Sequence, residues 1–448
     1  MRLSACLMVR DEERWLPGCL ASLTGVADEV IVVDTGSRDA TVSLARAAGA
    51  RVEHLAWADD FSAPRNRAVA LATGDWVLQI DADERLALQS GASLRAALEA
   101  GGFEAGLVRL HNAATLDAAP DEVLSGAKRL DEPQWLPRVF RRGPALQWQG
   151  VVHENVDAWL AATHEPPRGL DVDLVHFGAA AALKAERHKG ERNIRLLTAR
   201  CAADPDDAQA AGYLALELFE RGDTEAADRT VEASWARLQR WPASRSVLRL
   251  AAARALLALQ RRDFERMLAT TTEALARGGP HPDLLFLEGR AHELCAELRA
   301  GAVPELQRAA EAYQAALALA GRGDWRLSFQ GVSAPGCAVR CATAQLASGA
   351  LEAAQATLDS AGRLPVEGVM LKAELALARG RANDALALLM PVMGARAPAD
   401  AWLLAAAAAQ ALGAAADARV FFERAGGGGG RVAWHRRALA DALSRRLG

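Results

Sequence analysis

Three carboxylates follow directly on a short apolar run near residue 80. The run Trp76–Ile80 favours β-structure, is entered from Gly74, and therefore predicts a buried strand. Asp81, Asp83 and Glu84 come at the carboxyl end of this strand. Such closely spaced carboxylates repel one another unless a cation lies among them, and a divalent metal that also binds a diphosphate would fill that role. For an isolated Asp-x-Asp, an ordinary acidic turn is the commoner alternative.

Acidic residues also follow the other strands expected in this part of the chain. Strands are expected at 3–9, 28–33 and 51–57, alternating with helices at about 12–23, 37–48 (with Ser37 as N-cap) and 62–72. This alternation is typical of a mostly parallel sheet with helices on its faces, in which ligands bind beyond the carboxyl ends of the strands. The acids at these ends are Asp11, Asp34, Asp59, Asp60, Asp81 and Asp83. We expect them to line one edge of the sheet, where they can accept hydrogen bonds from a ribose or a base and bind one metal.

Phosphate-binding glycine loops do not occur in this sequence. Neither G-x-G-x-x-G nor G-x-x-x-x-G-K-[ST] is present, so no glycine loop at a helix N-terminus is expected to hold phosphates. A metal bridge is the remaining obvious means of holding them.

Four segments together resemble the successive blocks of glycosyltransferase family 2, which has the GT-A fold. They are LMVRDE at 7–12, VVDTGSRDAT at 32–41, DFSAPRN at 60–66 and GDWVLQIDADE at 74–84, and their spacing also fits. Arg138-x-Phe140 and GVVHE at 150–154 resemble the later part of the same family. The resemblance covers roughly the first 180 residues and does not identify the sugar.

The resemblance implies a nucleotide site at the strand ends. Asp34 is expected to contact the uracil or the ribose, and its alternative role is that of a turn-forming aspartate. Asp11 or Glu12 is expected to help to hold the base, unless these acids only favour the start of the following helix. Asp60 is expected at the nucleotide end as well.

The same resemblance implies a metal and diphosphate site. Asp83 is the expected ligand of Mn²⁺ or Mg²⁺, whereas Asp81 would approach the ribose, or the metal through water. Arg65 is expected either to steady the diphosphate or to orient Asp81. His176 ends an apolar run and is either structural or, as in other members of this fold, recruited to the metal.

Inverting sugar transfer also requires a base that removes the proton of the acceptor. The GVVHE block implies that Glu154 is this base, with His153 beside it. An exposed pair of residues in a turn is the alternative. Nearby, a strand is expected at 105–110, a loop bordering the acceptor site at 112–128, and a hairpin around Gly143 and Pro144.

Beyond residue 180 the chain becomes rich in alanine and helical in pattern. Pairs of helices are expected to join at turns containing Gly349, Gly380 and Gly413, which are 31 and 33 residues apart. This spacing is near the period of about 34 residues of tetratricopeptide repeats. Bulky residues such as Tyr213 are expected to fill the core of the resulting solenoid.

Composition adds few constraints on function. The 448 residues carry a net charge of −4, which provides no long-range attraction to nucleic acid or anionic membranes. The six cysteines are scattered, and neither a signal peptide nor a membrane span is recognisable, so a reducing cytoplasm is the expected location.

We therefore expect an α/β GT-A domain with a Rossmann-like mixed sheet at 1–180, followed by an all-α tetratricopeptide-like solenoid at 181–448. The expected function is metal-assisted, inverting transfer of a sugar from a nucleotide diphosphate donor, expected to be a UDP-sugar, to a peptide, protein or glycan. The helical repeats would bind a protein partner or a second copy of the chain. Alternatives are a non-catalytic repeat scaffold and a sugar nucleotidyltransferase; the latter needs a basic, glycine-rich segment where the chain has Arg-Asp-Glu-Glu at 10–13.

Overall fold

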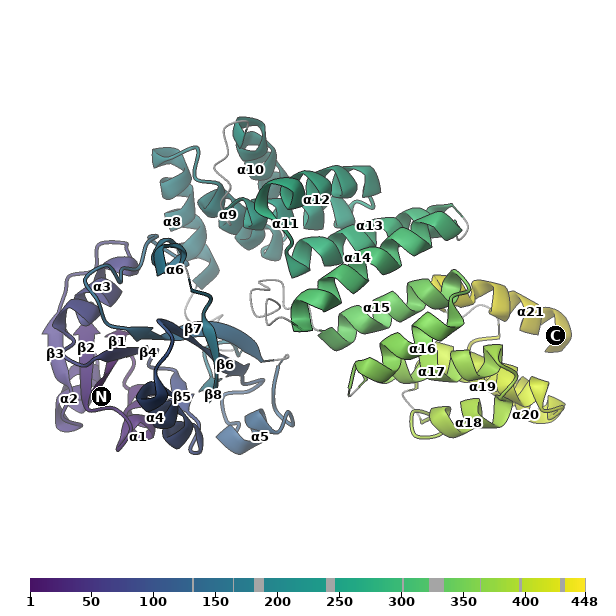
Figure 1. Cartoon of the computed structure of the whole chain (residues 1–448), viewed down its shortest axis with the longest axis horizontal. Coiled ribbons are helices and arrows are strands. Elements are labelled where there is room, and N and C mark those ends of the chain that lie inside the picture. The colour runs from purple at the N-terminus through teal and green to yellow at the C-terminus, as the bar shows by residue number, and fades with distance from the viewer. Residues whose placement is uncertain are drawn as a thin grey trace. The chain divides into compact units, whose positions relative to one another are not determined.

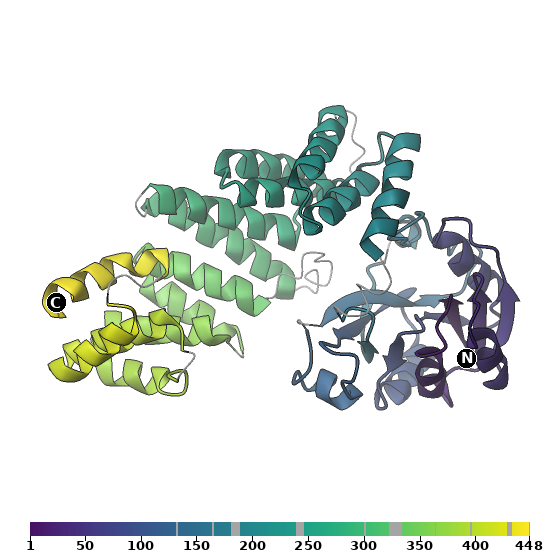
Figure 2. The same ribbon diagram turned by 180° about the vertical axis from the view of Figure 1, so that it is seen from behind.

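The structure is a computed structural model that describes residues 1–130, 133–163, 165–180, 189–238, 246–299, 302–321, 334–362, 364–394, 397–427 and 432–447. It divides into two compact units, Met1–Arg240 and Trp241–Gly448. Figures 1 and 2 show that the first unit combines a sheet with helices and that the second consists of helices.

An eight-stranded mixed sheet forms the centre of the first unit, in the order β3-β2-β1-β4-β7-β6-β8-β5. The strands are β1 (Leu3–Val9), β2 (Glu29–Asp34), β3 (Arg51–His54), β4 (Trp76–Gln79), β5 (Glu84–Leu86), β6 (Ala105–Asn112), β7 (Gln134–Arg141) and β8 (Arg168–His176). The helices of its α/β part are α1 (Leu16–Leu23), α2 (Thr41–Ala47), α3 (Ser62–Leu71), α4 (Ser90–Ala100), α5 (Pro120–Leu124) and α6 (Asp157–Thr163). Strands β1 to β4 are parallel to one another, whereas β7 is antiparallel to β4 and β6. This confirms the expected α/β fold with a mixed sheet.

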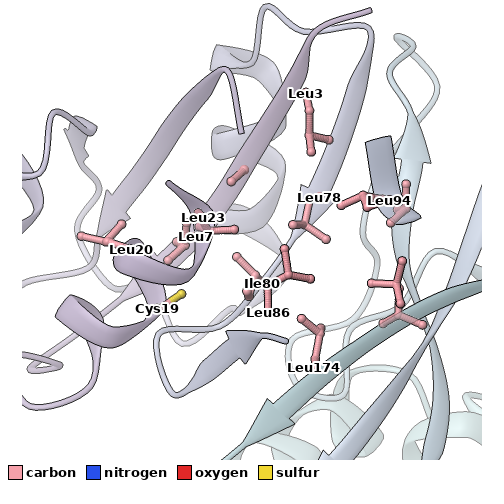
Figure 3. Close-up of a cluster of buried hydrophobic side chains, with 14 of the residues drawn as sticks. Leu3, Leu7, Cys19, Leu20, Leu23, Leu78, Ile80, Leu86, Leu94 and Leu174 are labelled. Carbon is pink, nitrogen blue, oxygen red and sulfur yellow. The ribbon is translucent and has the colours of Figure 1, made fainter. Parts of the chain in front are cut away.

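Side chains of β1 alternate between two buried layers, as the period of two in a strand requires. Leu3 and Leu7 lie in a layer that α1, α2 and α4 cover, and Leu20 and Leu94 join them there (Figure 3). Cys6 lies in the opposite layer, against α3. Full burial of a leucine side chain contributes about 1.5–3 kcal/mol, and a shift by one residue would exchange the two layers. The layers therefore fix the register of the central strands and the positions of the acids at their ends.

Two elements near the strand ends begin or end elsewhere than expected. Strand β3 stops at His54, before the expected end at Trp57. Helix α2 begins at Thr41 without Ser37 as its N-cap. Instead, the Ser37 hydroxyl accepts a hydrogen bond from the Asp11 backbone at 2.9 Å, which ties the loop after β1 to the loop after β2.

The expected hairpin around Gly143 and Pro144 is wrong. Strand β7 pairs with β4 and β6, and the following segment contributes only an isolated bridge between Gln149 and Asn155. The apolar side chains that suggested a strand, Leu146 and Trp148, are instead buried in the layer that contains α3. The expected loop at 112–128 also contains the short helix α5.

Three of the described helices of the expected repeat region lie within the first compact unit. They are α8 (Lys189–Ala203), α9 (Ala208–Glu220) and α10 (Thr224–Arg237). The compact units thus divide near residue 240, and the end of the transferase domain at residue 180 stays a prediction from the sequence.

The second unit is a series of helices. They are α11 (Ser246–Gln260), α12 (Phe264–Gly278), α13 (Pro282–Leu298), α14 (Val303–Gly321), α15 (Ala334–Ala347), α16 (Leu351–Ser360), α17 (Val366–Ala378), α18 (Ala382–Leu389), α19 (Ala399–Ala411), α20 (Ala415–Arg424), η3 (Trp434–Arg436) and α21 (Arg437–Leu447). Their interfaces are rich in buried alanine, which lets paired helices approach closely. In the described ranges of both units, every helix is too short or too polar to cross a membrane.

The three turn glycines expected from the repeat spacing join helix pairs. Gly349, Gly380 and Gly413 have φ of +85°, +73° and +77°, a region that glycine adopts at little cost. In each turn the residue after the glycine donates a backbone hydrogen bond to the helix before it, at 2.8–2.9 Å. This geometry confirms the expected helix–turn–helix units.

Candidate active site

The parallel strands bring their acidic ends to one edge of the sheet. Strand β1 lies between β2 and β4, with Val9 opposite Asp34 and Cys6 opposite Gln79. Asp34 is the last residue of β2, and Asp81 follows β4 after one further residue. The convergence expected from the sequence is therefore present in the sheet.

Hydrogen bonds join the loops after β1 and β2. The Asp11 carboxylate accepts a bond from the Arg38 backbone at 2.7 Å, and the Glu12 backbone donates to the Thr41 hydroxyl at 2.7 Å. Asp11 has a φ of +54°, which is uncommon for a residue with a side chain. The two loops therefore form one connected segment along the edge, where Asp11 and Glu12 were expected to hold a base.

Asp34 lies beneath this edge and is only 3% exposed. Its carboxylate accepts hydrogen bonds from the backbone of Gly36 at 3.2 Å and Ser37 at 3.1 Å, and it lies 3.1 Å from His54 Nδ1. Burial raises the pKa of Asp34, but these hydrogen bonds more than offset it and lower the pKa below its usual value. The carboxylate is therefore ionised and holds the loop in shape. Direct contact with a nucleotide stays a prediction.

Asp60 caps the start of α3. Its Oδ1 accepts hydrogen bonds from the Ser62 backbone and hydroxyl, both at 2.7 Å, and from the Ala63 backbone at 3.4 Å. Side-chain acceptors of this kind satisfy backbone donors that have no partner within the helix. The geometry gives Asp60 a structural use, and its expected place at the nucleotide end stays a prediction.

Arg65 joins two acidic segments that are far apart in the sequence. From the buried side of α3, its Nη1 donates to Asp81 Oδ1 at 3.0 Å and its Nε donates to Glu154 Oε1 at 2.5 Å. Burial lowers the pKa of Arg65, but the charges of Asp81 and Glu154 more than offset this and raise it. Arg65 therefore orients Asp81, one of the two roles expected for it. Contact with a diphosphate stays a prediction.

A second arginine, Arg138 on β7, lies on the other side of Asp81. Its Nη2 donates to Asp81 Oδ2 at 3.3 Å and also to Glu84 Oε1. Burial raises the pKa of Asp81, but the charges of Arg65 and Arg138 more than offset it and hold the pKa well below its usual value. Burial raises the pKa of Glu84 to about 8, although the charge of Arg138 opposes the rise. Asp81 is therefore a fixed anion between two cations.

Asp83 meets His176 where the ends of β5, β6 and β8 come together. His176 Nε2 lies 3.8 Å from Asp83 Oδ1, and the other ring nitrogen, Nδ1, lies 2.8 Å from Asn112 Oδ1. Asn112 and His176 are partners in the parallel pairing of β6 with β8. Because an amide oxygen only accepts hydrogen bonds, Nδ1 donates to Asn112, and Nε2 is the ring nitrogen that faces Asp83.

This pair fits part of a divalent metal site. Carboxylate oxygen and neutral imidazole nitrogen are both ligands of Mn²⁺, and a metal-bound histidine usually donates its other N–H to an oxygen, as His176 does to Asn112. Gly178 keeps the space beside the pair open, since a β-carbon there would lie 2.3 Å from Asp83 Oδ2 and 2.5 Å from His176 Nε2. Among the described residues, no group of three or more His, Cys, Asp or Glu side chains is placed to hold a metal ion.

Glu154 and His153 are adjacent but turn to different partners. Glu154 is bound to Arg65, which places it in the charged network of Asp81. The His153 ring stacks on Tyr213 of α9, with ring centroids 4.0 Å apart and planes 7° apart. The expectation that Tyr213 fills a solenoid core is therefore wrong, because this half-buried ring packs on the α/β part of the unit.

Arg138 and Asn112 belong to this site but were not among the residues expected to form it, and Glu84, expected in the acidic cluster, pairs with Arg138. Arg138 stood in a recognised block, although no role followed from it. Its position on a strand beside β4 depends on the antiparallel pairing of β7, which the expected hairpin obscured. Asn112 could have been found only from its register with His176 on β8.

Comparison with known proteins gives a family match for the N-terminal part of the chain. Residues 4–158 match the model of the family described as glycosyl transferase family 2. The N-terminal part of this chain carries a family 2 glycosyltransferase domain. All the strand-end acids and both Arg65 and Glu154 fall within the matched region, whereas His176 lies beyond it.

Parts of the chain also match curated proteins and solved structures. A TPR repeat-containing protein of Synechococcus elongatus is 37% identical over 234 residues, which cover 51% of this chain and 55% of that protein. The SPbeta prophage-derived glycosyltransferase SunS of Bacillus subtilis is 24% identical over 219 residues, covering 47% of this chain and 48% of SunS. Among solved structures, residues 1–349 of TarS from S. aureus align with a TM-score of 0.35 at 17% identity, over 63% of this chain and 93% of that one. The chain thus spans about half the length of the curated relatives it matches.

Proposed function

We propose that this protein transfers a sugar, with inversion, from a nucleotide diphosphate donor to a peptide, protein or glycan. The observation that carries the proposal is the charged network Arg138–Asp81–Arg65–Glu154 at the strand ends of a family 2 domain. Through Arg65, the network connects Asp81, which is expected at the donor, to Glu154, which is expected at the acceptor. A UDP-sugar is the donor we favour, in line with the acids available to hold a ribose and a base.

On this proposal, Asp83 and His176 hold Mn²⁺ or Mg²⁺ together with the diphosphate oxygens of the donor. The bound metal would neutralise the charge that develops on the leaving diphosphate. Asn112 holds the His176 ring in the orientation in which Nε2 faces the site. Asp81, fixed between Arg65 and Arg138, is positioned to accept a hydrogen bond from the ribose.

Glu154 is the proposed base. Inversion requires the acceptor to attack the anomeric carbon from the face opposite the leaving diphosphate, while a group on that side removes the acceptor proton. Glu154 belongs to the loop after β7, and its Oε1 is bonded to the Arg65 guanidinium, which also binds Asp81. A carboxylate held in place by a buried arginine is preorganised for this proton transfer.

The proposal is tested by thermal unfolding of the full chain with UDP-, GDP- and dTDP-sugars, with and without Mn²⁺. A ligand that binds only the folded state raises the melting temperature, by an amount set by its concentration and affinity. We expect a UDP-sugar to raise it only when Mn²⁺ is present, and Asp83→Asn to abolish this rise. Asp121→Asn, which changes an exposed acid of α5, is the matched control and should leave the rise intact. If no nucleotide sugar shifts the wild-type protein, or if Asp83→Asn behaves like the control, the proposal is wrong.

A further inference from the structure

His153 has a backbone conformation that its side chain disfavours. Its φ is +53°, in the left-handed region, and it follows Gly150, whose φ is +103°. A residue with a β-carbon stays in this region only when its surroundings hold it there. The segment from 150 to 155 therefore depends on contacts made from outside itself.

Helix α9 supplies the main contacts to His153. The ring stacks face to face on Tyr213, and Nε2 lies 3.2 Å from Glu217 Oε1. The same carboxylate oxygen accepts a hydrogen bond from Asn193 Nδ2 of α8 at 2.8 Å. Since a carboxylate only accepts hydrogen bonds, His153 Nε2 carries the hydrogen and donates a hydrogen bond to Glu217. Tyr213 thus holds the face of the imidazole, and Glu217 holds its edge.

The two helices also hold the neighbours of this segment. Asn155 Nδ2 donates to Gln209 Oε1 of α9 at 3.4 Å. Arg195 of α8 forms two hydrogen bonds of 2.8 Å with the Asp59 carboxylate, and the backbone of Phe61 donates to Val151 O at 2.9 Å. Helices α8 and α9 therefore contact both of the loops that lead to Arg65 and Glu154.

Glu154 directly follows the strained residue. While His153 is turned toward α9, the next side chain points back to Arg65, where its Oε1 meets Nε. The φ and ψ of His153 set the direction in which the chain leaves it, and so set where the Glu154 carboxylate lies. If residue 153 relaxed to an ordinary conformation, the carboxylate would leave Arg65.

We infer that Tyr213 and Glu217 of α9, a helix of the expected repeat region, are positioning residues that hold the proposed base, Glu154, through His153. This inference rests on the proposed function, in which Glu154 removes the acceptor proton. On this inference, helices α8 and α9, which lie outside the sequence blocks that resemble family 2, help to position the base. His153 is on this view a positioning residue and not a second base.

The test uses the full-length protein with Tyr213→Ala, Tyr213→Phe, Glu217→Gln and, as the matched control, Glu220→Gln. Glu220 is an exposed acid at the end of the same helix. Two quantities are measured: amide hydrogen exchange of a peptide covering 150–156, and turnover of a UDP-sugar with kcat and donor KM determined separately. Tyr213→Phe keeps the ring that stacks on His153 and therefore serves as the conservative rescue.

We expect Tyr213→Ala and Glu217→Gln to exchange faster at 150–156 and to lower kcat by about tenfold or more, because general base catalysis supplies roughly 10²–10⁴-fold and a misplaced base loses part of it. Donor KM should not change, and Tyr213→Phe and Glu220→Gln should resemble the wild type. Unchanged exchange and kcat in Tyr213→Ala would overturn the inference, as would an equal loss in Glu220→Gln. If the wild type turns over no donor, the proposed function fails, while the exchange measurement still decides whether α9 holds this segment.

Discussion

Gly178 shows how a missing side chain shapes the candidate metal site. Its backbone lies so close to Asp83 and His176 that a β-carbon would clash with both, at 2.3 Å from Asp83 Oδ2 and 2.5 Å from His176 Nε2. No φ in the left-handed region requires a glycine there. The need for glycine is therefore steric, and it arises at the two side chains proposed to hold the metal.

Gly178→Ala should separate Asp83 from His176 and abolish the Mn²⁺-dependent rise in melting temperature caused by a UDP-sugar. Overpacking of this kind costs about 1–3 kcal/mol, so the variant should still fold. The control is Gly143→Ala, where an added β-carbon meets no atom within 4 Å. Thermal unfolding with and without Mn²⁺ checks the prediction, which is wrong if both variants retain the full response.

Asp173 on β8 provides a pH-dependent contribution to stability. Its carboxylate accepts bonds from Arg109 Nε at 2.6 Å and Nη2 at 2.8 Å, and lies 2.8 Å from His111 Nε2. Burial raises the pKa of Asp173, but these partners more than offset it and hold the pKa below the usual 3.8. A carboxyl whose pKa is lower in the folded state stabilises the fold above its unfolded pKa, and the contribution is lost as the pH falls through the folded value.

Asp173→Asn should therefore lower the free energy of unfolding by about 1–3 kcal/mol near neutral pH, as expected for hydrogen bonds to charged groups. The difference from the wild type should shrink as the pH falls below about 4. Asp171→Asn is the control, because Asp171 is 80% exposed and its pair with Arg109 should contribute little. Denaturant titrations at several pH values measure the difference. A deficit that grows toward acid would contradict the assignment.

At the scale of elements, the described turns of the pairs α9–α10, α15–α16, α17–α18 and α19–α20 share one geometry, which the pair α11–α12 reaches without a glycine. Four pairs have a glycine of positive φ between their helices, and in the pair α11–α12 this place is taken by Arg262, with a φ of +56°. The residue after it, Asp263, donates its backbone N–H to Ala258 O at 2.9 Å, as the corresponding residues do in the other turns. Arg262 thus adopts a glycine conformation at the cost of strain.

Arg262→Gly should raise the free energy of unfolding by about 1 kcal/mol, since the left-handed conformation costs a residue with a side chain about 1–2 kcal/mol. The exposed ion pair with Glu297 would be lost, and such pairs contribute little. Gly380→Ala, at a φ of +73°, is the reciprocal change and should destabilise the protein. Urea unfolding of both variants measures the effect, and a less stable Arg262→Gly would show that the ion pair outweighs the strain.

The sequence predicted elements best where pattern and turn chemistry agree. Strand β1 and the turn glycines lay where expected, because a short, largely apolar run and a glycine at helix-pair spacing each specify a local structure. The hairpin after β7 failed because apolar residues such as Trp148 can be buried without joining a sheet. Contacts such as Arg138 with Asp81 depend on pairing between distant strands, which local patterns do not contain.

At the scale of the molecule, the first unit extends beyond the α/β part. Helices α8 to α10 share it, so contacts between repeat helices and the transferase loops are internal to one compact body. Alanine content and the loss of strand signals predicted that helices follow the sheet, as α8 to α10 do, but such signals describe the elements and not the compact units into which they pack.

A chain that ends at residue 240 should therefore bind the donor as the full chain does, with the same Mn²⁺-dependent rise in melting temperature. A chain that ends at residue 180 lacks Tyr213 and Glu217, and should show faster hydrogen exchange at 150–156. Exchange measured by mass spectrometry on both truncated proteins distinguishes them. Equal protection in the two would show that the first repeat helices are dispensable for this segment.

Arg65 sets a condition for redesigning acceptor preference by exchanging loops. A graft that replaces the segment around Glu154 with one from another enzyme would leave a buried guanidinium without one of its two acidic partners unless it brings a carboxylate to that position. Removing one partner of a buried ion pair typically costs about 3–5 kcal/mol, a large part of the stability of an ordinary domain. Libraries that vary this loop should keep position 154 acidic and randomise around it.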